Sequence, residues 1–249
     1  MRVAVISDPH GDLLALSKVI ADVELAGPID EVLLGGDLAQ GGPQPAEVID
    51  EVRRRGWRSV RGNSDEFLIR IAGADMAGAL PKSVVDRGAW SAQQLGRERI
   101  EYLRSLPTSI ELGPFPFGKV TLVHATPWST EEVVLPDAAD EVADRMVRES
   151  SARLVVYGHI HTQYQRRVHE GALVSVGAVS GSNDADPRPA YTILSLGMTI
   201  SVEPRRVDWP DEERQSDYAR AGIARRFAVP RAGQFPVRCR PGIPVTLWP

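Results

Sequence analysis

The side chains in this sequence of 249 residues that could carry out chemistry together are imidazoles, carboxylates and one amide. Asp8 and His10 are separated by one residue, and the same spacing relates His159 to His161. Four of the five histidines lie at or just beyond the end of a short apolar run, which scattered core histidines would not be expected to do. The full set of candidate ligands is Asp8, His10, Asp37, Asn63, His124, His159 and His161.

These residue types are typical of a metal centre. Imidazole nitrogen suits zinc, iron, manganese, nickel or copper rather than calcium or magnesium alone. Seven ligands are too many for one mononuclear site, but they suit two metal ions that share a bridging carboxylate. Two metals about 3.5–4 Å apart are the usual arrangement for phosphoryl hydrolysis, because together they acidify a bridging water and hold the phosphate. With only two aspartates against two divalent cations, such a site keeps positive charge for an anionic ester.

Five short apolar runs must position these side chains. Each run is typical of a buried strand, and the carboxyl ends of strands in an open α/β sheet are where ligands bind. We therefore expect all seven side chains on one rim of a sheet. The residue before a proline favours extended backbone, so Asp8 and His10 are expected to point to the same side. The five runs cover residues 3–6, 32–34, 57–60, 119–123 and 153–157.

Helical patterns separate the first strands. Asp12 is placed to cap a helix that begins at Leu13, and residues 45–55 form a second amphipathic pattern. This βαβαβ order indicates a largely parallel sheet covered by helices. Further helices are expected within residues 66–107 and over residues 137–150. Four later runs are typical of antiparallel strands, at residues 165–168, 173–176, 191–196 and 199–202.

The ordered motifs resemble those of the calcineurin-like metallophosphoesterase superfamily. They are Asp8-Pro9-His10, Gly36-Asp37, Gly62-Asn63-Ser64-Asp65, His124 and Gly158-His159-Ile160-His161, which match D-x-H, G-D, G-N-x-D/E, H and G-H-x-H in order. The resemblance covers about residues 1–196. Within the superfamily, the sequence is most similar to the small bacterial phosphoesterases that include the YfcE-like phosphodiesterases. The resemblance implies an α/β fold, a four-layer sandwich of two mixed β-sheets flanked by helices.

The resemblance also implies a role for each motif position. One metal would be held by Asp8, His10, Asp37 and His161. Asp37 would bridge to a second metal completed by Asn63, His124 and His159. We expect two divalent transition-metal ions per chain, manganese first, with iron, zinc or nickel as alternatives. A hydroxide between the two metals would attack phosphorus, and the expected catalytic residues are Asp37, Asn63 and His124.

Two positions beside these ligands bear on the substrate. Asn63 would also contact the phosphate. Arg61 stands where related phosphatases carry an arginine, so it either contacts a substrate oxygen or forms a surface ion pair with a nearby carboxylate.

Ser64 departs from the pattern of the family. Many members carry a histidine at this position, which protonates the leaving alkoxide. A serine hydroxyl is a poor acid near neutral pH, so acid catalysis worth about 10² to 10⁴ would be missing. The phosphodiesterases of this family often carry a residue other than histidine here, so the resemblance favours phosphodiesters over monoesters. Asp65 is then expected either to bind Ser64 or to cap a helix over residues 66–71.

Composition excludes several functional classes. The sequence has 43% hydrophobic and 25% charged residues, as in an ordinary globular protein. Its net charge of −4 gives no whole-chain sign of affinity for nucleic acid or anionic membranes. No apolar run reaches membrane-spanning length, and the first run is too short for a signal peptide. Cys239 is the only cysteine, so we expect no internal disulfide and a cytoplasmic location.

The chain is expected to divide near residue 204. Residues 1–204 would form the phosphoesterase domain, with a helical cap at about residues 66–106. Residues 205–249 would add a helix at residues 211–226 and a Pro/Arg-rich extension. The last 21 residues hold five prolines, three arginines and no acidic residue, so this tail could lie over the domain or form a mobile arm.

Two other functions on the same fold remain alternatives. A non-catalytic interaction scaffold is favoured by Ser64 and by the basic tail, although the intact ligand set argues against it. A nuclease is favoured only by local basic patches at residues 53–55 and 166–167. We therefore expect a small phosphate ester as the substrate and neither membrane nor nucleic acid as a partner. A homo-oligomer is a further possibility.

Overall fold

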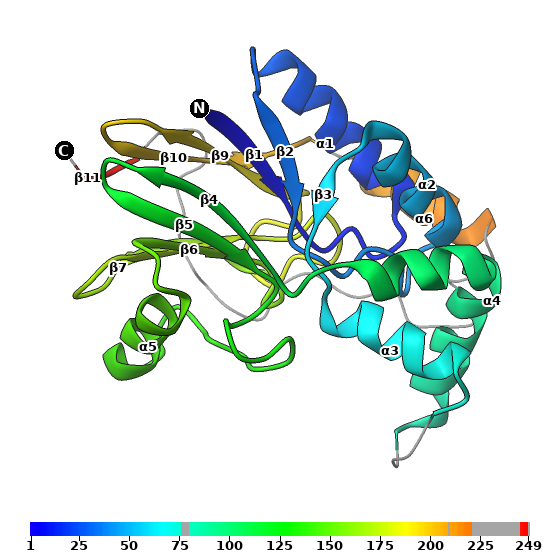
Figure 1. The fold of residues 1–249 in the computed structure, drawn as a ribbon. Helices are drawn as coiled ribbons and strands as arrows, with labels where there is room; N and C mark the ends of the chain where they lie inside the picture. The colour runs from blue at the N-terminus through cyan, green and yellow to red at the C-terminus, as the bar shows by residue number, and fades with distance from the viewer. Residues whose placement is uncertain (76–79, 209, 221–244, 249) are drawn as a thin grey trace.

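Two β-sheets lie face to face in the computed structural model, which describes residues 1–75, 80–208, 210–220 and 245–248 (Figure 1). The first sheet has the strand order β11-β10-β9-β1-β2-β3. Its centre is β1 (Arg2–Ile6), which pairs in parallel with β2 (Glu31–Leu34) and antiparallel with β9 (Ala190–Leu196). The remaining strands are β3 (Arg58–Ser59), β10 (Ile200–Arg206) and β11 (Val245–Trp248).

The second sheet has the order β4-β5-β6-β8-β7. Its three central strands run in parallel and its two edge strands are antiparallel to them. The four late runs expected to form consecutive antiparallel strands are therefore divided, two in each sheet. Strands of this sheet are β4 (Ser109–Phe115), β5 (Gly118–Val123), β6 (Leu154–Tyr157), β7 (Gln163–Arg167) and β8 (Ala172–Val176).

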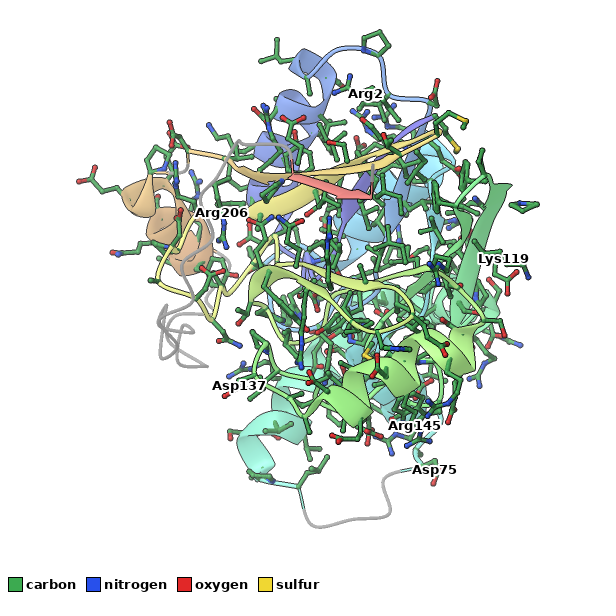
Figure 2. The ribbon with its side chains drawn as sticks, turned by 90° about the vertical axis from the view of Figure 1, so that its left-hand side faces the viewer. Arg2, Asp75, Lys119, Asp137, Arg145 and Arg206 are labelled. Carbon is green, nitrogen blue, oxygen red and sulfur yellow. The ribbon has the colours of Figure 1, made fainter. Side chains whose placement is uncertain are left out.

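Helices cover the outer faces of both sheets, which gives the four-layer α/β sandwich expected from the resemblance (Figure 1). The helix α5 (Asp140–Ser150) packs on the second sheet. In Figure 2, Arg145 of α5 and Arg2 of β1 lie on opposite sides of the molecule. The helices on the side of the first sheet are α1 (Leu13–Leu25), α2 (Pro45–Arg55), α3 (Asn63–Ala72), α4 (Lys82–Ser105) and α6 (Asp211–Arg220).

The alternation of side chains along buried strands produces the layers. In β1, Ala4 and Ile6 pack against the helices, whereas Val3 and Val5 pack between the two sheets. In β6, Val155 and Tyr157 face α5, whereas the residues on either side of Val155 face the space between the sheets. Strands that are apolar on both faces can be buried on both faces, so continuous apolar runs suit this architecture.

Local signals define several helix boundaries. The Asp12 carboxylate accepts a hydrogen bond from the backbone N–H of Ala15 at 3.0 Å and caps α1, as expected. Pro45 opens α2, and Gly56 ends it in the left-handed conformation. The long helix α4 is broken by a non-helical Gly96 and packs against α2 and α3.

The carboxyl-terminal segment is described only in part. Residues 211–220 form α6, so the expected helix is present over these residues, and the rest of it lies outside the described residues, as does most of the Pro/Arg-rich extension. No helix in the described part of the chain combines the length and the apolarity that crossing a membrane requires. The expected boundary near residue 204 stays a prediction.

Candidate metal centre

The loops that follow five strands bring the seven candidate ligands together, but from two sheets rather than one. Three of the loops follow β1, β2 and β3 of the first sheet, and two follow β5 and β6 of the second. The expectation of one rim on one sheet was wrong, because strand pairing over long sequence separations decides which strands share a sheet. The centre therefore lies where the carboxyl ends of two face-to-face sheets meet.

Left-handed backbone shapes these loops. Asp8 and His10 have φ angles of 55° and 48°, so the extended geometry expected after β1 is wrong. Such angles cost about 1–3 kcal/mol each in residues other than glycine, and they gather at functional sites. Seven residues other than glycine have positive φ in the described part of the chain, and five of them are candidate ligands. The five are Asp8, His10, Asp37, His159 and His161.

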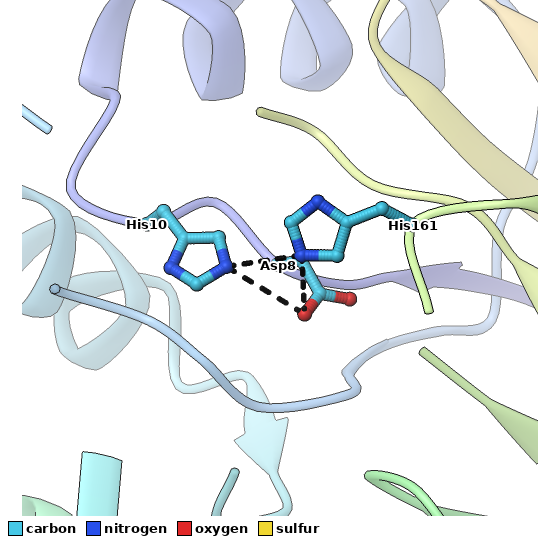
Figure 3. Close-up of side chains that lie close together, drawn as sticks. All are labelled: Asp8, His10 and His161. Carbon is cyan, nitrogen blue, oxygen red and sulfur yellow. Dashed lines mark hydrogen bonds and ion pairs between the residues drawn. The ribbon is translucent and has the colours of Figure 1, made fainter. Parts of the chain in front are cut away.

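One group of ligand atoms consists of Asp8, His10 and His161 (Figure 3). The two imidazole Nε2 atoms are 3.1 Å apart. Asp8 Oδ1 lies 3.4 Å from Nε2 of His161 and 3.9 Å from Nε2 of His10. Asp8 is fully buried, and its Oδ1 has no hydrogen-bond partner. A buried carboxylate oxygen facing two ring nitrogens fits a cation ligand, because leaving it unpaired is costly.

A second group forms around Asp37 and Asn63. Asp37 Oδ1 lies 3.4 Å from Nε2 of His124. Asn63 Oδ1 lies 2.9 Å from the same atom and 3.0 Å from Nδ1 of His159. Asp37 Oδ2 faces the first group instead, at 3.6 Å from Nε2 of His10. The two oxygens of Asp37 thus face different sets of imidazoles.

Each of the four imidazoles is oriented by a backbone carbonyl. Nδ1 of His10 contacts the carbonyl of Gln40 at 3.0 Å, and Nδ1 of His124 contacts that of Gly35 at 2.7 Å. A carbonyl can only accept, so in the neutral ring the outer nitrogen carries the proton and the inner nitrogen presents its lone pair. Metal-binding histidines nearly always have such an outer partner. The other two contacts join His161 Nδ1 to Gly181 O at 2.7 Å and His159 Nε2 to Glu131 O at 3.1 Å.

The electrostatics of the centre follow from burial and from the two aspartates. Burial alone would raise the pKa of Asp8, but the neighbouring His161 holds it below its ordinary value. Burial alone would lower the pKa of His161, but the charge of Asp8 raises it to about 9. Burial lowers the pKa of His10, and His161 adds to this shift. Shifted pKa values among convergent ligand atoms are typical of functional sites.

Asp65 has one of its two expected roles, capping the helix that follows β3, and Ser64 binds the Asp37 carboxylate. The Ser64 hydroxyl donates to Asp37 Oδ2 at 2.6 Å. Asp65 is fully buried and accepts from three backbone N–H groups, those of Asp37, Leu38 and Gly62, each at 2.9 Å. Burial and the nearby Asp37 raise the pKa of Asp65 to about 7. Asp65 lies within α3, which begins at Asn63 rather than at residue 66, and it fastens the start of this helix to the loop after β2.

Arg61 is engaged in the ion pair that was one of its two expected roles. Its Nε lies 3.2 Å from Glu66 Oε1, and its Nη1 donates to the carbonyls of Arg104 and Leu106 at 3.1 Å each. The second oxygen of Glu66 accepts from Thr130 Oγ1 at 3.0 Å. Contact of Arg61 with a substrate oxygen stays a prediction.

The motif glycines have a steric cause. A Cβ added to Gly62 would lie 2.1 Å from Asp37 Oδ1, and one added to Gly158 would lie 2.5 Å from Asp8 Oδ2. Both glycines thus let backbone approach a candidate ligand closely. The sequence did not reveal the orienting carbonyls, since every residue carries one and only the fold decides which of them meet an imidazole.

Comparison with known proteins agrees with this geometry. The sequence matches the family model of the calcineurin-like phosphoesterase superfamily domain over residues 1–198. The curated protein MJ0912 of Methanocaldococcus jannaschii is 28% identical over 224 residues, which cover 83% of this chain and 87% of that protein. The crystal structure of a metallophosphoesterase from Sphaerobacter thermophilus is 25% identical and has a TM-score of 0.71, covering 91% of this chain and 98% of its own. PH1004 from Pyrococcus horikoshii, 16% identical with a TM-score of 0.78, covers 89% of this chain and 94% of its own and shares the fold.

Proposed function

We propose, from the premise that this chain belongs to the calcineurin-like phosphoesterase superfamily, that it hydrolyses phosphate esters with two divalent metal ions. The observation that carries the proposal is the orientation of the four imidazoles. Each has its outer nitrogen on a backbone carbonyl and its inner nitrogen beside Asp8, Asp37 or Asn63. This donor set fits transition-metal ions.

The arrangement supports an assignment of residues to the two ions. Asp8, His10 and His161 would hold the first, and Asn63, His124 and His159 the second. Asp37 would bridge them, because one of its oxygens faces His10 and the other faces His124. We expect manganese, with iron, zinc or nickel as alternatives.

When bound, the two ions would supply an activated water nucleophile and positive charge for the phosphoryl oxygens. The residues of the chain would orient the ester and hold the ligands in place. Asn63 lies between His124 and His159 and would orient the ester through its amide group. The Asp65 carboxylate holds the backbone of Asp37 in place through the hydrogen bond from the Asp37 N–H at 2.9 Å.

The proposed substrate is a phosphodiester. The position from which family members protonate the leaving group holds Ser64, and the Ser64 hydroxyl donates to Asp37 rather than offering its proton to a substrate. Hydrolysis without a general acid favours good leaving groups, because the developing charge on oxygen is then smaller. We propose a small cytoplasmic diester as the natural substrate class.

Side-by-side assays of bis-p-nitrophenyl phosphate and p-nitrophenyl phosphate test this proposal. Chelator-stripped protein is reloaded with manganese, iron, zinc, nickel or magnesium before each assay. We expect the diester to be preferred and activity to be lost in His124→Ala. His169→Ala is the matched control, because His169 lies outside the centre and should leave activity unchanged.

Two outcomes would contradict the proposal. Preference for the monoester would mean that another group supplies the acid. A wild-type protein that is inert with every metal, and that co-purifies with a stable partner, would instead support the scaffold alternative.

A further inference from the structure

Helix α6 brings a tyrosine hydroxyl to the loop that follows β1. Tyr218 is buried, with 4% of its surface exposed, and its hydroxyl donates to Asp12 Oδ2 at 3.1 Å. The helix packs against α1, where Lys18 also pairs with Glu213 at 3.4 Å. Tyr218 lies beyond residues 1–198, the part of the chain that matches the superfamily domain. A residue beyond the matched part of the chain therefore contacts the segment that carries two candidate ligands.

Asp12 connects this segment to α1. It is fully buried, and its other oxygen caps the helix at the N–H of Ala15. Its own N–H donates to the carbonyl of Pro9 at 2.8 Å, inside the turn that carries Asp8 and His10. A change in the position of the Asp12 carboxylate would therefore directly change the geometry of this turn.

Ser180 joins the same cluster from the loop after β8. Its hydroxyl lies 3.4 Å from both the Tyr218 hydroxyl and Asp12 Oδ2. Its backbone N–H donates to the carbonyl of Asp8 at 3.1 Å. The next residue, Gly181, supplies the carbonyl that orients His161. Tyr218 thus lies where the segment of Asp8 and His10 meets the segment that orients His161.

We infer that Tyr218 is a positioning residue for the metal group formed by Asp8, His10 and His161. It acts through Asp12 and Ser180 and has no contact role with the substrate. The inference rests on the proposed function, because it concerns a metal ion held by these three residues. Removing an outer partner of a metal ligand commonly lowers metal affinity by about 10- to 100-fold. Tyr218 acts one step further out, so we expect about a tenfold loss, at the lower end of that range.

The fold should survive loss of the Tyr218 hydroxyl. The opposite side of the turn is fastened by the loop after β2, through hydrogen bonds from His10 N to Asp37 O at 3.0 Å and from Gly11 N to Leu38 O at 2.8 Å. Phenylalanine keeps the buried ring of Tyr218 and removes only its oxygen. The change therefore tests the position of the turn rather than the presence of the helix.

The experiment measures equilibrium affinity for Mn²⁺ in chelator-stripped wild type, Tyr218→Phe and Tyr191→Phe, by competition with a chromophoric chelator. Tyr191 is the matched control, because it is fully buried and its hydroxyl donates to Asp22 Oδ2 at 2.6 Å, on α1 but away from the turn. A parallel urea titration records the stability of each variant. The same pair of tyrosine changes is also made in a His124→Ala background, which leaves the first metal group intact.

We expect Tyr218→Phe to weaken Mn²⁺ binding about tenfold in both backgrounds while Tyr191→Phe leaves it unchanged. Equal affinity in wild type and Tyr218→Phe, or an equal loss in both tyrosine variants, would overturn the inference. A wild-type protein that binds no Mn²⁺ would overturn the proposed metal centre itself.

Discussion

Most of the candidate ligands combine a left-handed backbone with a polar side chain aimed at the centre. These are the residues at which local preference and tertiary structure disagree. Residue types and spacing were enough to predict that the seven candidate ligands lie close together. Their conformation was not predictable, because Pro9 favours an extended Asp8, whereas hydrogen bonds from the loop after β2 and from Ser180 hold the turn closed.

Ser64 is the residue on which the choice of substrate depends. Ser64→His would place a proton donor where the family carries one. We expect the ratio of monoester to diester kcat/KM to rise at least about tenfold, since general acid catalysis contributes about 10² to 10⁴. Ser64→Ala is the control and should leave the ratio low. An unchanged ratio in Ser64→His with full metal content would show that this position does not set the preference.

Ser7 occupies the space that a side chain at position 35 would need, which explains the glycine there. A Cβ on Gly35 would lie 2.4 Å from Ser7 Oγ, and the nearest atom outside that side chain would be Ser7 Cα at 3.7 Å. We expect Gly35→Ala to lower the free energy of unfolding by about 1–3 kcal/mol through overpacking. Ser7→Gly should recover much of this loss in the double variant, as measured by urea denaturation. Strictly additive effects would refute this steric explanation.

At the scale of elements, single helices could be predicted from the sequence, whereas the contacts between distant elements could not. The patterns of α1 and α2 were predictable, because caps and apolar spacing are local. The division of the late strands between two sheets was not, because β8 pairs with β6 and β9 pairs with β1 over long separations. The contact of α6 with Asp12 was equally invisible in the sequence.

The loop after β8, which carries Ser180 and Gly181, is held in place by a buried ion pair between Asp184 and Arg206. Removing one partner of a buried pair leaves an uncompensated charge, so we expect Arg206→Met to cost about 3–5 kcal/mol of unfolding free energy. Arg188→Met is the control, because Arg188 is 38% exposed in its pairs with Asp186 and Asp208 and should cost less than about 1 kcal/mol. Equal losses in urea denaturation would contradict this account.

The end of α2 should make the free energy of unfolding depend measurably on acid pH. Hydrogen bonds from Arg54 and then Arg55 lower the pKa of Glu51 from 4.5 to about 2. A lowered acid pKa stabilises the fold above the unfolded value and loses this effect as pH falls through the folded value. We expect Glu51→Gln to have a lower free energy of unfolding than wild type at pH 6. The two free energies should converge near pH 2. The pair is near the surface, so the difference at pH 6 should be below about 1 kcal/mol; a difference that grows on acidification would contradict the assignment.

For the whole molecule, the fold class followed from the resemblance and the site from convergence of strand ends. The resemblance supplied the two-sheet sandwich, which composition and periodicity alone did not indicate. The core explains why the order of motifs is informative: apolar strands buried on both faces end at the same place, and each end carries a ligand. What the whole molecule adds beyond the motifs is the set of backbone carbonyls that orient the imidazoles.

The number of divalent ions bound per chain tests the central claim most directly. Chelator-stripped protein is dialysed against Mn²⁺ and the bound metal is measured by elemental analysis, with His159→Ala as the site variant and His169→Ala as the control. The account predicts two ions per chain in wild type and His169→Ala, and one fewer in His159→Ala. A wild-type protein that binds one ion or none at saturating Mn²⁺ would contradict it.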